Sequence, residues 1–135
     1  MTPRFYVATT LENHAQHNAV RDRLHVIGHE ITYDWTTHNS VWREGAARIA
    51  EVAVAELQGV VSADYVVVLL PGGRGTHCEL GMALATGKPV AIYGTDAQLG
   101  VSPETCAFYH HPLVRRLWYL DSLETLARQI AAYPR

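Results

Sequence analysis

The apolar residues of this chain follow two alternating patterns. Short runs rich in β-branched and aromatic residues predict strands at residues 4–9, 30–35, 65–70, 89–93 and 114–120. Segments with helical spacing of apolar residues, or with helix boundary signals, predict helices at 13–27, 41–61, 77–86 and 121–133. Residues 94–113 show no clear period, so an irregular loop or lid is expected there.

Boundary signals support these elements. Gly28 and Gly87 fit helix ends, and Asp121 with Glu124 three residues later fits a helix start. The run 65–70 is continuously apolar, as is typical of a central parallel strand covered on both faces. Together the pattern predicts an α/β fold. We expect a single doubly wound three-layer α/β/α domain over residues 1–135, with a five-stranded parallel sheet of flavodoxin-like order 2-1-3-4-5.

Composition excludes several classes of protein. The chain has 135 residues, and 11 Lys and Arg against 13 Asp and Glu give a net charge of −2, which argues against a nucleic-acid-binding surface. The longest apolar run, residues 65–70, falls far short of the ~20 residues of a membrane helix. A strand-like run starts directly after the N-terminus, so no signal peptide is expected. A cytoplasmic protein without a membrane partner is predicted.

Metal and disulfide signals are weak. Cys78 and Cys106 are too few and too far apart for a disulfide framework or a metal knuckle. His110 and His111 resemble a metal pair, but adjacent residues on an extended chain point apart and no third ligand has a suitable spacing. We therefore predict no metal site and no cofactor.

The predicted fold places the ligand at the carboxyl ends of the first and third strands, where the winding reverses. Two loops meet there, residues 9–14 and 71–78. The second loop is Gly-rich and leads into a helix, so its backbone N–H groups suit an anion, and an Arg side chain adds a positive charge. It matches neither the dinucleotide fingerprint nor the Walker loop. The substrate-binding candidates of the two loops are Thr9, Gly72, Gly73, Arg74, Gly75, Thr76 and His77.

Two interpretations of Glu79 stay open at this point. In the first, Thr76 and Glu79 form a T-x-x-E capping box at the start of a helix. In the second, Glu79 is a nucleophile or base in the first turn, kept ionised by the helix dipole. The two roles are compatible with each other.

Four further residues are candidates for the site. Tyr6 is either a core residue or a phenol that positions Glu79. Asp34 either caps a turn or binds substrate, and Trp35 is available to stack on a base. Glu56 lies at the edge of a helical apolar stripe, where a solvated residue is the simpler interpretation.

Several of these motifs resemble a known family. The chain contains FYVA at 5–8, YDW at 33–35 and ADYVVVLLPGGRGTHCELGMALATGKPV at 63–90. These segments are similar to the nucleoside 2-deoxyribosyltransferase family, which includes deoxynucleoside-monophosphate N-glycosidases. The stretch PGGRGTHCE also fits the PGGxGTxxE signature of the cytokinin-activating phosphoribohydrolases. Both families break an N-glycosidic bond between a base and a sugar.

The resemblance implies roles for individual residues. Glu79 matches the nucleophilic glutamate and Tyr6 the tyrosine that orients it, while Glu56 stands where many members carry a pocket aspartate. Gly73 stands where the best-known transferases carry an aspartate that handles the base, six residues before the nucleophile. The proton for the leaving base must then come from elsewhere, with Arg74, His77 and water as candidates.

The expected activity is cleavage of the N-glycosidic bond of (deoxy)nucleosides through a covalent glycosyl-glutamate, with transfer of the deoxyribosyl group to another nucleobase. Hydrolysis of (deoxy)nucleoside 5′-monophosphates and a catalytically silent nucleotide sensor are the alternatives. A flavodoxin-like electron carrier is not favoured, because its phosphate loop would follow the first strand. The resemblance also implies a homodimer or a higher homo-oligomer.

Overall fold

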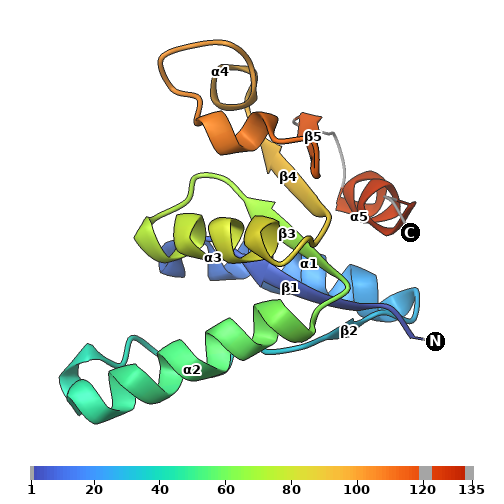
Figure 1. Ribbon diagram of the computed structural model, residues 1–135. Helices are drawn as coiled ribbons and strands as arrows, with labels where there is room; N and C mark the ends of the chain where they lie inside the picture. Colours follow the sequence, from blue (N-terminus) through green and yellow to red (C-terminus); the bar gives the residue numbers. More distant parts are fainter. Residues whose placement is uncertain (1, 119–122, 133–135) are drawn as a thin grey trace.

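A five-stranded parallel sheet forms the centre of the molecule, in the order β2-β1-β3-β4-β5 (Figure 1). The structure is a computed structural model that describes residues 2–118 and 123–132. Its strands are β1 (Arg4–Ala8), β2 (Glu30–Ile31), β3 (Tyr65–Leu69), β4 (Val90–Gly94) and β5 (Val114–Trp118). The predicted α/β class, parallel sheet and strand order are confirmed.

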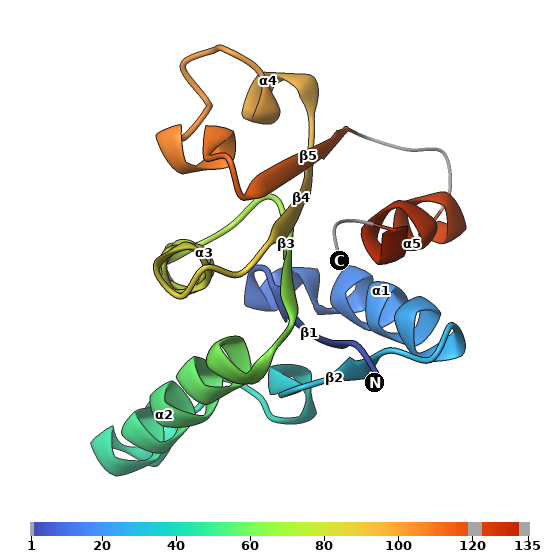
Figure 2. The same cartoon turned by 45° about the vertical axis from the view of Figure 1, so that its right-hand side comes forward.

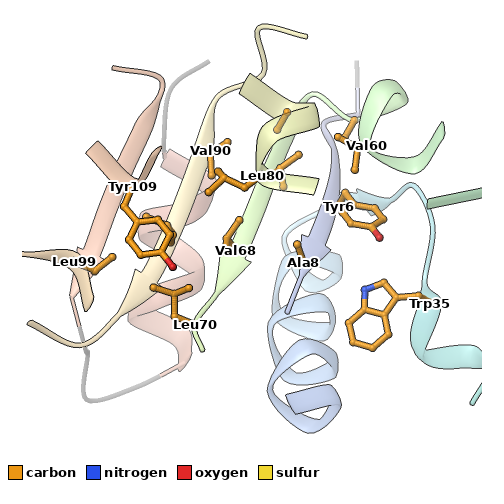
Figure 3. Close-up of a cluster of buried hydrophobic side chains, with 14 residues drawn as sticks. Tyr6, Ala8, Trp35, Val60, Val68, Leu70, Leu80, Val90, Leu99 and Tyr109 are labelled. Atoms are coloured by element: carbon orange, nitrogen blue, oxygen red, sulfur yellow. The ribbon is translucent and has the colours of Figure 1, made fainter. Parts of the chain in front are cut away.

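Helices cover both faces of the sheet (Figure 2). One face carries α1 (His14–Val26) and α5 (Leu123–Ala132), and the other carries α2 (Ala46–Ser62) and α3 (Arg74–Ala85). Because side chains alternate along a strand, β1 contributes to both cores. Phe5 and Val7 join the core under α1 and α5, whereas Tyr6 and Ala8 join the core under α2 and α3 (Figure 3).

The second strand is shorter than predicted. It ends at Ile31, and the chain then turns into a 3₁₀ helix, η2 (Trp35–Thr37). The Asp34 carboxylate caps this turn by accepting from the backbone N–H of Thr36 at 2.9 Å. The prediction that Asp34 and Trp35 end a strand is therefore wrong, because the local cap favours a turn.

Two helices begin at different residues from those predicted. A short 3₁₀ segment, η3 (Trp42–Glu44), is followed by Gly45, whose φ of 96° is not helical and separates η3 from α2. Helix α3 begins at Arg74 and not at residue 77. Its N-cap is Gly73, and the Gly73 N–H donates to Thr76 Oγ1 at 3.1 Å. The predicted capping box between Thr76 and Glu79 is therefore wrong, since Thr76 already lies inside the helix.

Residues 94–113 contain more regular structure than the sequence indicated. Short helices form at α4 (Asp96–Leu99) and η4 (Ala107–His110), and α4 has its own cap, in which Thr95 Oγ1 accepts from the Gln98 N–H at 3.2 Å. A further 3₁₀ turn, η1 (Leu11–Asn13), comes before α1. The predicted cap at Asp121 lies outside the described residues.

The predicted helix ends are confirmed at both glycines, with φ of 92° at Gly28 and 72° at Gly87. The adjacent histidines form separate contacts: His110 Nδ1 lies 2.7 Å from Arg116 Nη1, and His111 Nδ1 accepts from the Leu113 N–H at 3.0 Å. Among the described helices, none is long and apolar enough to cross a membrane.

Candidate active site

A cleft of about 400 Å³ lies where the segments after β1 and β3 meet α2. This is the ligand position expected for a doubly wound sheet. Eight of the predicted site residues line it, together with three that continue the chain after β1. The cleft is lined by Thr9, Thr10, Leu11, Glu12, Trp35, Glu56, Gly73, Arg74, Gly75, Thr76 and Glu79.

A buried tyrosine–glutamate pair lies at this cleft. The Tyr6 hydroxyl donates to Glu79 Oε2 at 2.6 Å. Tyr6 is fully buried, and Glu79 is only 6% exposed. Tyr6 reaches the pair from β1 and Glu79 from α3, so the two packed elements fix the contact. The Glu79 carboxyl group also interacts with the Glu56 side chain through a hydrogen bond.

Glu79 and Glu56 form a coupled pair of carboxyl groups. Burial raises the pKa of Glu79 to about 8, and the nearby charge of Glu56 adds to this shift, while the Tyr6 hydrogen bond opposes it. Burial also raises the pKa of Glu56. The prediction that the helix dipole keeps Glu79 ionised is wrong. Glu79 lies in the second turn of α3, where the dipole is weaker and desolvation decides the protonation state.

The first turn of α3 also lines the cleft. Arg74 is exposed there, and it makes no ion pair with any residue in the described ranges. Gly72 does not line the cleft, but it supports this turn, because a Cβ at Gly72 would lie 2.7 Å from Thr76 Cγ2. The free N–H groups of a helix start and one guanidinium are suited to binding an anionic or electron-rich group.

Asp34 and Trp35, two further residues predicted for the site, make contacts that stabilise the fold. Asp34 pairs with Arg21 at 2.6 Å and does not line the cleft. Hydrogen bonds from Thr36 and Arg21 outweigh the effect of burial and lower the pKa of Asp34. Trp35 lines the cleft but is only 5% exposed, and its Nε1 donates to the Val7 carbonyl at 2.8 Å (Figure 3).

His77 does not line the cleft. Its Nδ1 lies 2.7 Å from the Gly73 carbonyl oxygen, and its Nε2 lies 2.7 Å from the Tyr109 hydroxyl. A carbonyl oxygen can only accept, so Nδ1 carries a proton. These contacts join η4 to the start of α3.

A second hollow of about 230 Å³ adjoins the cleft and shares Leu11, Trp35 and Glu56 with it. Its other lining residues include His38 and Trp42, which sequence analysis did not select. Trp42 is 63% exposed and belongs to η3, the segment before α2. The hollow therefore depends on how this segment packs in the folded protein. No local motif marks these residues, although an exposed tryptophan is a general sign of a binding surface.

Within the described residues, no group of three or more His, Cys, Asp or Glu side chains is arranged to hold a metal ion. The chemistry available at the cleft comes from the hydroxyl of Tyr6, the two carboxyl groups and the start of α3. A carboxylate held by a phenol beside a second carboxyl group is suited to nucleophilic attack on a sugar carbon.

Comparisons with solved structures identify proteins of the same fold. The CMP N-glycosidase BcmB of Clostridium botulinum superposes with a TM-score of 0.66 at 14% identity, over 95% of this chain and 98% of that one. A conserved protein from Enterococcus faecalis superposes with a TM-score of 0.57 at 18% identity, over 98% of this chain and 99% of that one. Among curated proteins, no sequence relative matches the chain.

The sequence profile of one family matches most of the chain. The nucleoside 2-deoxyribosyltransferase family matches residues 5–109, which include Tyr6 of β1, the Gly-rich segment, Glu56 and Glu79. It is a family of enzymes, in agreement with the carboxyl pair at the cleft. The chain therefore belongs to the nucleoside 2-deoxyribosyltransferase family.

Proposed function

We propose that the protein cleaves the N-glycosidic bond of (deoxy)nucleosides and transfers the deoxyribosyl group to another nucleobase. The observation that carries this proposal is the 2.6 Å hydrogen bond between Tyr6 and Glu79 at a cleft that also contains Glu56. A carboxylate next to the anomeric carbon traps an oxocarbenium-like centre, as in retaining glycosidases.

In the first step, Glu79 Oε1 forms a bond to C1′ while the bond from C1′ to the base nitrogen breaks. The electron pair of the broken bond stays on the base, which takes a proton from Glu56. Burial favours one shared proton in the carboxyl pair, and the raised pKa of Glu79 places this proton on Glu79 in the ligand-free site. The proposed reactive form has the proton on Glu56, and the Tyr6 hydrogen bond favours this form because it lowers the pKa of Glu79. Glu56 is therefore the proposed acid, in place of Arg74, His77 or water.

In the second step, a nitrogen of an incoming nucleobase attacks C1′ and displaces Glu79. The proton lost by this nitrogen returns to Glu56, so the enzyme regains its starting state. If water takes the place of the base, the products are the free sugar and the free base. Exclusion of water from the cleft decides between transfer and hydrolysis.

Neutral nucleosides fit the charges of the cleft better than phosphorylated ones. Three carboxyl side chains, Glu12, Glu56 and Glu79, face one cation, Arg74. With one proton shared by Glu56 and Glu79, two carboxylates remain beside this cation, and they would repel a 5′-phosphate dianion. Arg74 at the start of α3 is the feature that supports the second candidate, a nucleoside 5′-monophosphate N-glycosidase, and the described activity of BcmB is of this kind.

We also propose a homo-oligomer in which α2 meets a second copy. Helix α2 extends away from the sheet (Figures 1 and 2). Four of its large apolar side chains are between 43% and 58% exposed: Ile49, Val54, Leu57 and Val61. Exposed alanines lie beside them, at positions 46, 47, 50 and 53. Such an apolar helix face in a water-soluble protein indicates a protein interface.

The experiment is chromatography of deoxynucleosides and their 5′-monophosphates after incubation with the protein. Each substrate is tested with and without a second nucleobase, and a Glu79→Gln variant serves as the control. A new nucleoside indicates transfer, and free base alone indicates hydrolysis. If no substrate changes at high enzyme concentration, the sensor alternative replaces the enzyme.

A further inference from the structure

Gly59 of α2 lies in unusually close contact with two aromatic residues. A Cβ atom built on Gly59 would lie 2.9 Å from Tyr33 Cβ, 3.0 Å from Tyr6 Cδ2 and 3.1 Å from Tyr6 Cε2. The Tyr6 ring is fully buried, and Tyr33 Cβ is fixed to its backbone, so neither can move away freely. Only glycine allows α2 to approach this closely.

The backbone of Gly59 is also tied to the sheet. Thr32 Oγ1 donates to the Gly59 carbonyl at 2.6 Å, and Thr32 follows directly after β2. The backbone at Gly59 has no positive φ. Glycine is therefore required at this position for space and not for backbone conformation.

This contact lies next to the reacting groups. Tyr6 touches Gly59 with its ring edge and Glu79 with its hydroxyl. Glu56 lies three residues before Gly59, so both residues occupy the same face of α2. The separation between α2 and the Tyr6 ring thus determines how closely Glu56 approaches Glu79.

We propose that Gly59 is a positioning residue: its missing side chain lets α2 pack on Tyr6 and brings the Glu56 carboxyl to Glu79. The catalytic meaning of this role rests on the proposed function, whereas the geometric part does not. No step of the chemistry involves Gly59 itself, because it acts through Tyr6 and Glu56.

The test compares Gly59→Ala with Gly81→Ala. Gly81 is an exposed residue of α3 with no atom within 4 Å of a built Cβ, so both variants gain helix propensity but only one meets a clash. We expect Gly59→Ala to lower kcat by ~10²-fold with a smaller change in KM, as for a misplaced reacting group. Gly81→Ala should keep the wild-type kcat.

A double-mutant cycle separates positioning from general damage. If Gly59 acts by placing Glu56, Gly59→Ala should change kcat by less than about twofold in a Glu56→Gln background. If the loss of kcat in the double variant equals the product of the losses in the two single variants, the proposal is overturned.

A second readout needs no substrate. The Glu79 carboxyl is titrated by NMR with ¹³C-labelled glutamate in the ligand-free protein. Because Glu56 helps to raise the pKa of Glu79, Gly59→Ala should lower this pKa, and Gly81→Ala should leave it unchanged. A lowered pKa without activity on any nucleoside would reject the proposed function and support the positioning role. An unchanged titration in Gly59→Ala would overturn the positioning role.

If Gly59→Ala fails to fold, Thr32→Val and Thr32→Ser take its place. The first removes the hydroxyl that binds the Gly59 carbonyl, and the second keeps it. We expect the lower pKa of Glu79 in Thr32→Val only. An equal pKa of Glu79 in both Thr32 variants would contradict the proposal.

Discussion

The Tyr6 hydroxyl lies 2.6 Å from Glu79 Oε2, although 73 positions separate the two residues along the chain. The contact is buried, so solvent does not compete with it. A phenol in this position donates to the carboxylate, limits its rotation and favours its ionised form. It therefore connects the fold of the sheet directly with the protonation of the proposed nucleophile.

Tyr6→Phe removes this donor and keeps the aromatic ring. Because the Tyr6 hydrogen bond lowers the pKa of Glu79, we expect that pKa to rise in the variant. The rate of base release at pH 7 should fall by about tenfold or more, while the free energy of unfolding changes by no more than ~1 kcal/mol. Kinetics and thermal melting of both proteins test this. A loss of stability with an unchanged rate would give Tyr6 a purely structural role.

Glu79→Gln should abolish turnover and leave the fold intact. The amide has nearly the same size but is a poor nucleophile, so we expect a loss on the order of 10³-fold or more. Base release is measured by chromatography, and the fold is checked by circular dichroism. Activity within about tenfold of wild type, equivalent to only ~1.4 kcal/mol of barrier, would falsify the assignment of Glu79 as nucleophile.

The same variant should change how stability depends on pH. The pKa of Glu79 is about 8 in the folded protein, against 4.5 for the free side chain. Between these values the folded state binds the extra proton, so stability falls as pH rises through this window, by at most ~1.4 kcal/mol per pH unit. Urea titrations at pH 5 and pH 8 should show a weaker pH dependence for Glu79→Gln than for wild type. Equal dependence in both proteins would mean that Glu79 titrates normally.

The pH profile of kcat/KM should have its basic limb near pH 8. One proton shared by Glu56 and Glu79 is needed for the leaving base, and it is lost as the pair titrates. Glu56→Gln should lower the rate and remove this limb. A profile that rises through pH 8 to a plateau would show that only the ionisation of Glu79 matters.

Arg74→Ala distinguishes the two candidate substrates. If a 5′-monophosphate is the substrate, the variant should lose ~1.5–3 kcal/mol of binding for it and almost nothing for the matching nucleoside. If the substrate is a nucleoside, both compounds should be affected equally or not at all. KM values of both compounds, measured with both proteins, decide between these outcomes.

Leu57→Glu should lower the mass of the proposed oligomer. Leu57 is 43% exposed near the middle of the apolar face of α2, where a charge would be buried by a second copy. Light scattering should give a multiple of 15.0 kDa for wild type and a smaller mass for the variant. Gln58→Glu, on an exposed position of the same helix, serves as the matched control. A fully active wild-type monomer would reject the proposed interface.

The layers and the strand order could be predicted because alternating strands and helices leave few arrangements of a parallel sheet. Sequence analysis also placed the cleft at the ends of β1 and β3, and most of the selected residues lie there. The start of α3 could not be predicted, because Thr76 fits an N-cap as well as a position inside the first turn. The choice depends on the Gly73 N–H, which donates to the Thr76 side chain.

Two features of the site depend on tertiary packing alone. The raised pKa of Glu79 comes from burial and from Glu56, a residue on a different helix, so no local pattern contains it. Gly59 looks like any glycine within an Ala-rich helix, and its importance appears only where α2 meets Tyr6 and Tyr33. The alternation along β1 separates Tyr6 from Phe5 and Val7, and the contact of Tyr6 with Glu79, one of the two interpretations of this residue, is present in the structure.

The register of the sheet has a consequence for how activity reports on folding. Tyr6 pairs with Val66 of β3, and its neighbours Phe5 and Val7 face the other core. A slip of β1 by one residue would exchange the two faces and bring an aliphatic or phenyl side chain in place of the phenol. A chain with the correct helices but a shifted strand would then be compact and inactive, so the rate of base release during refolding measures the fraction of molecules with the native strand alignment.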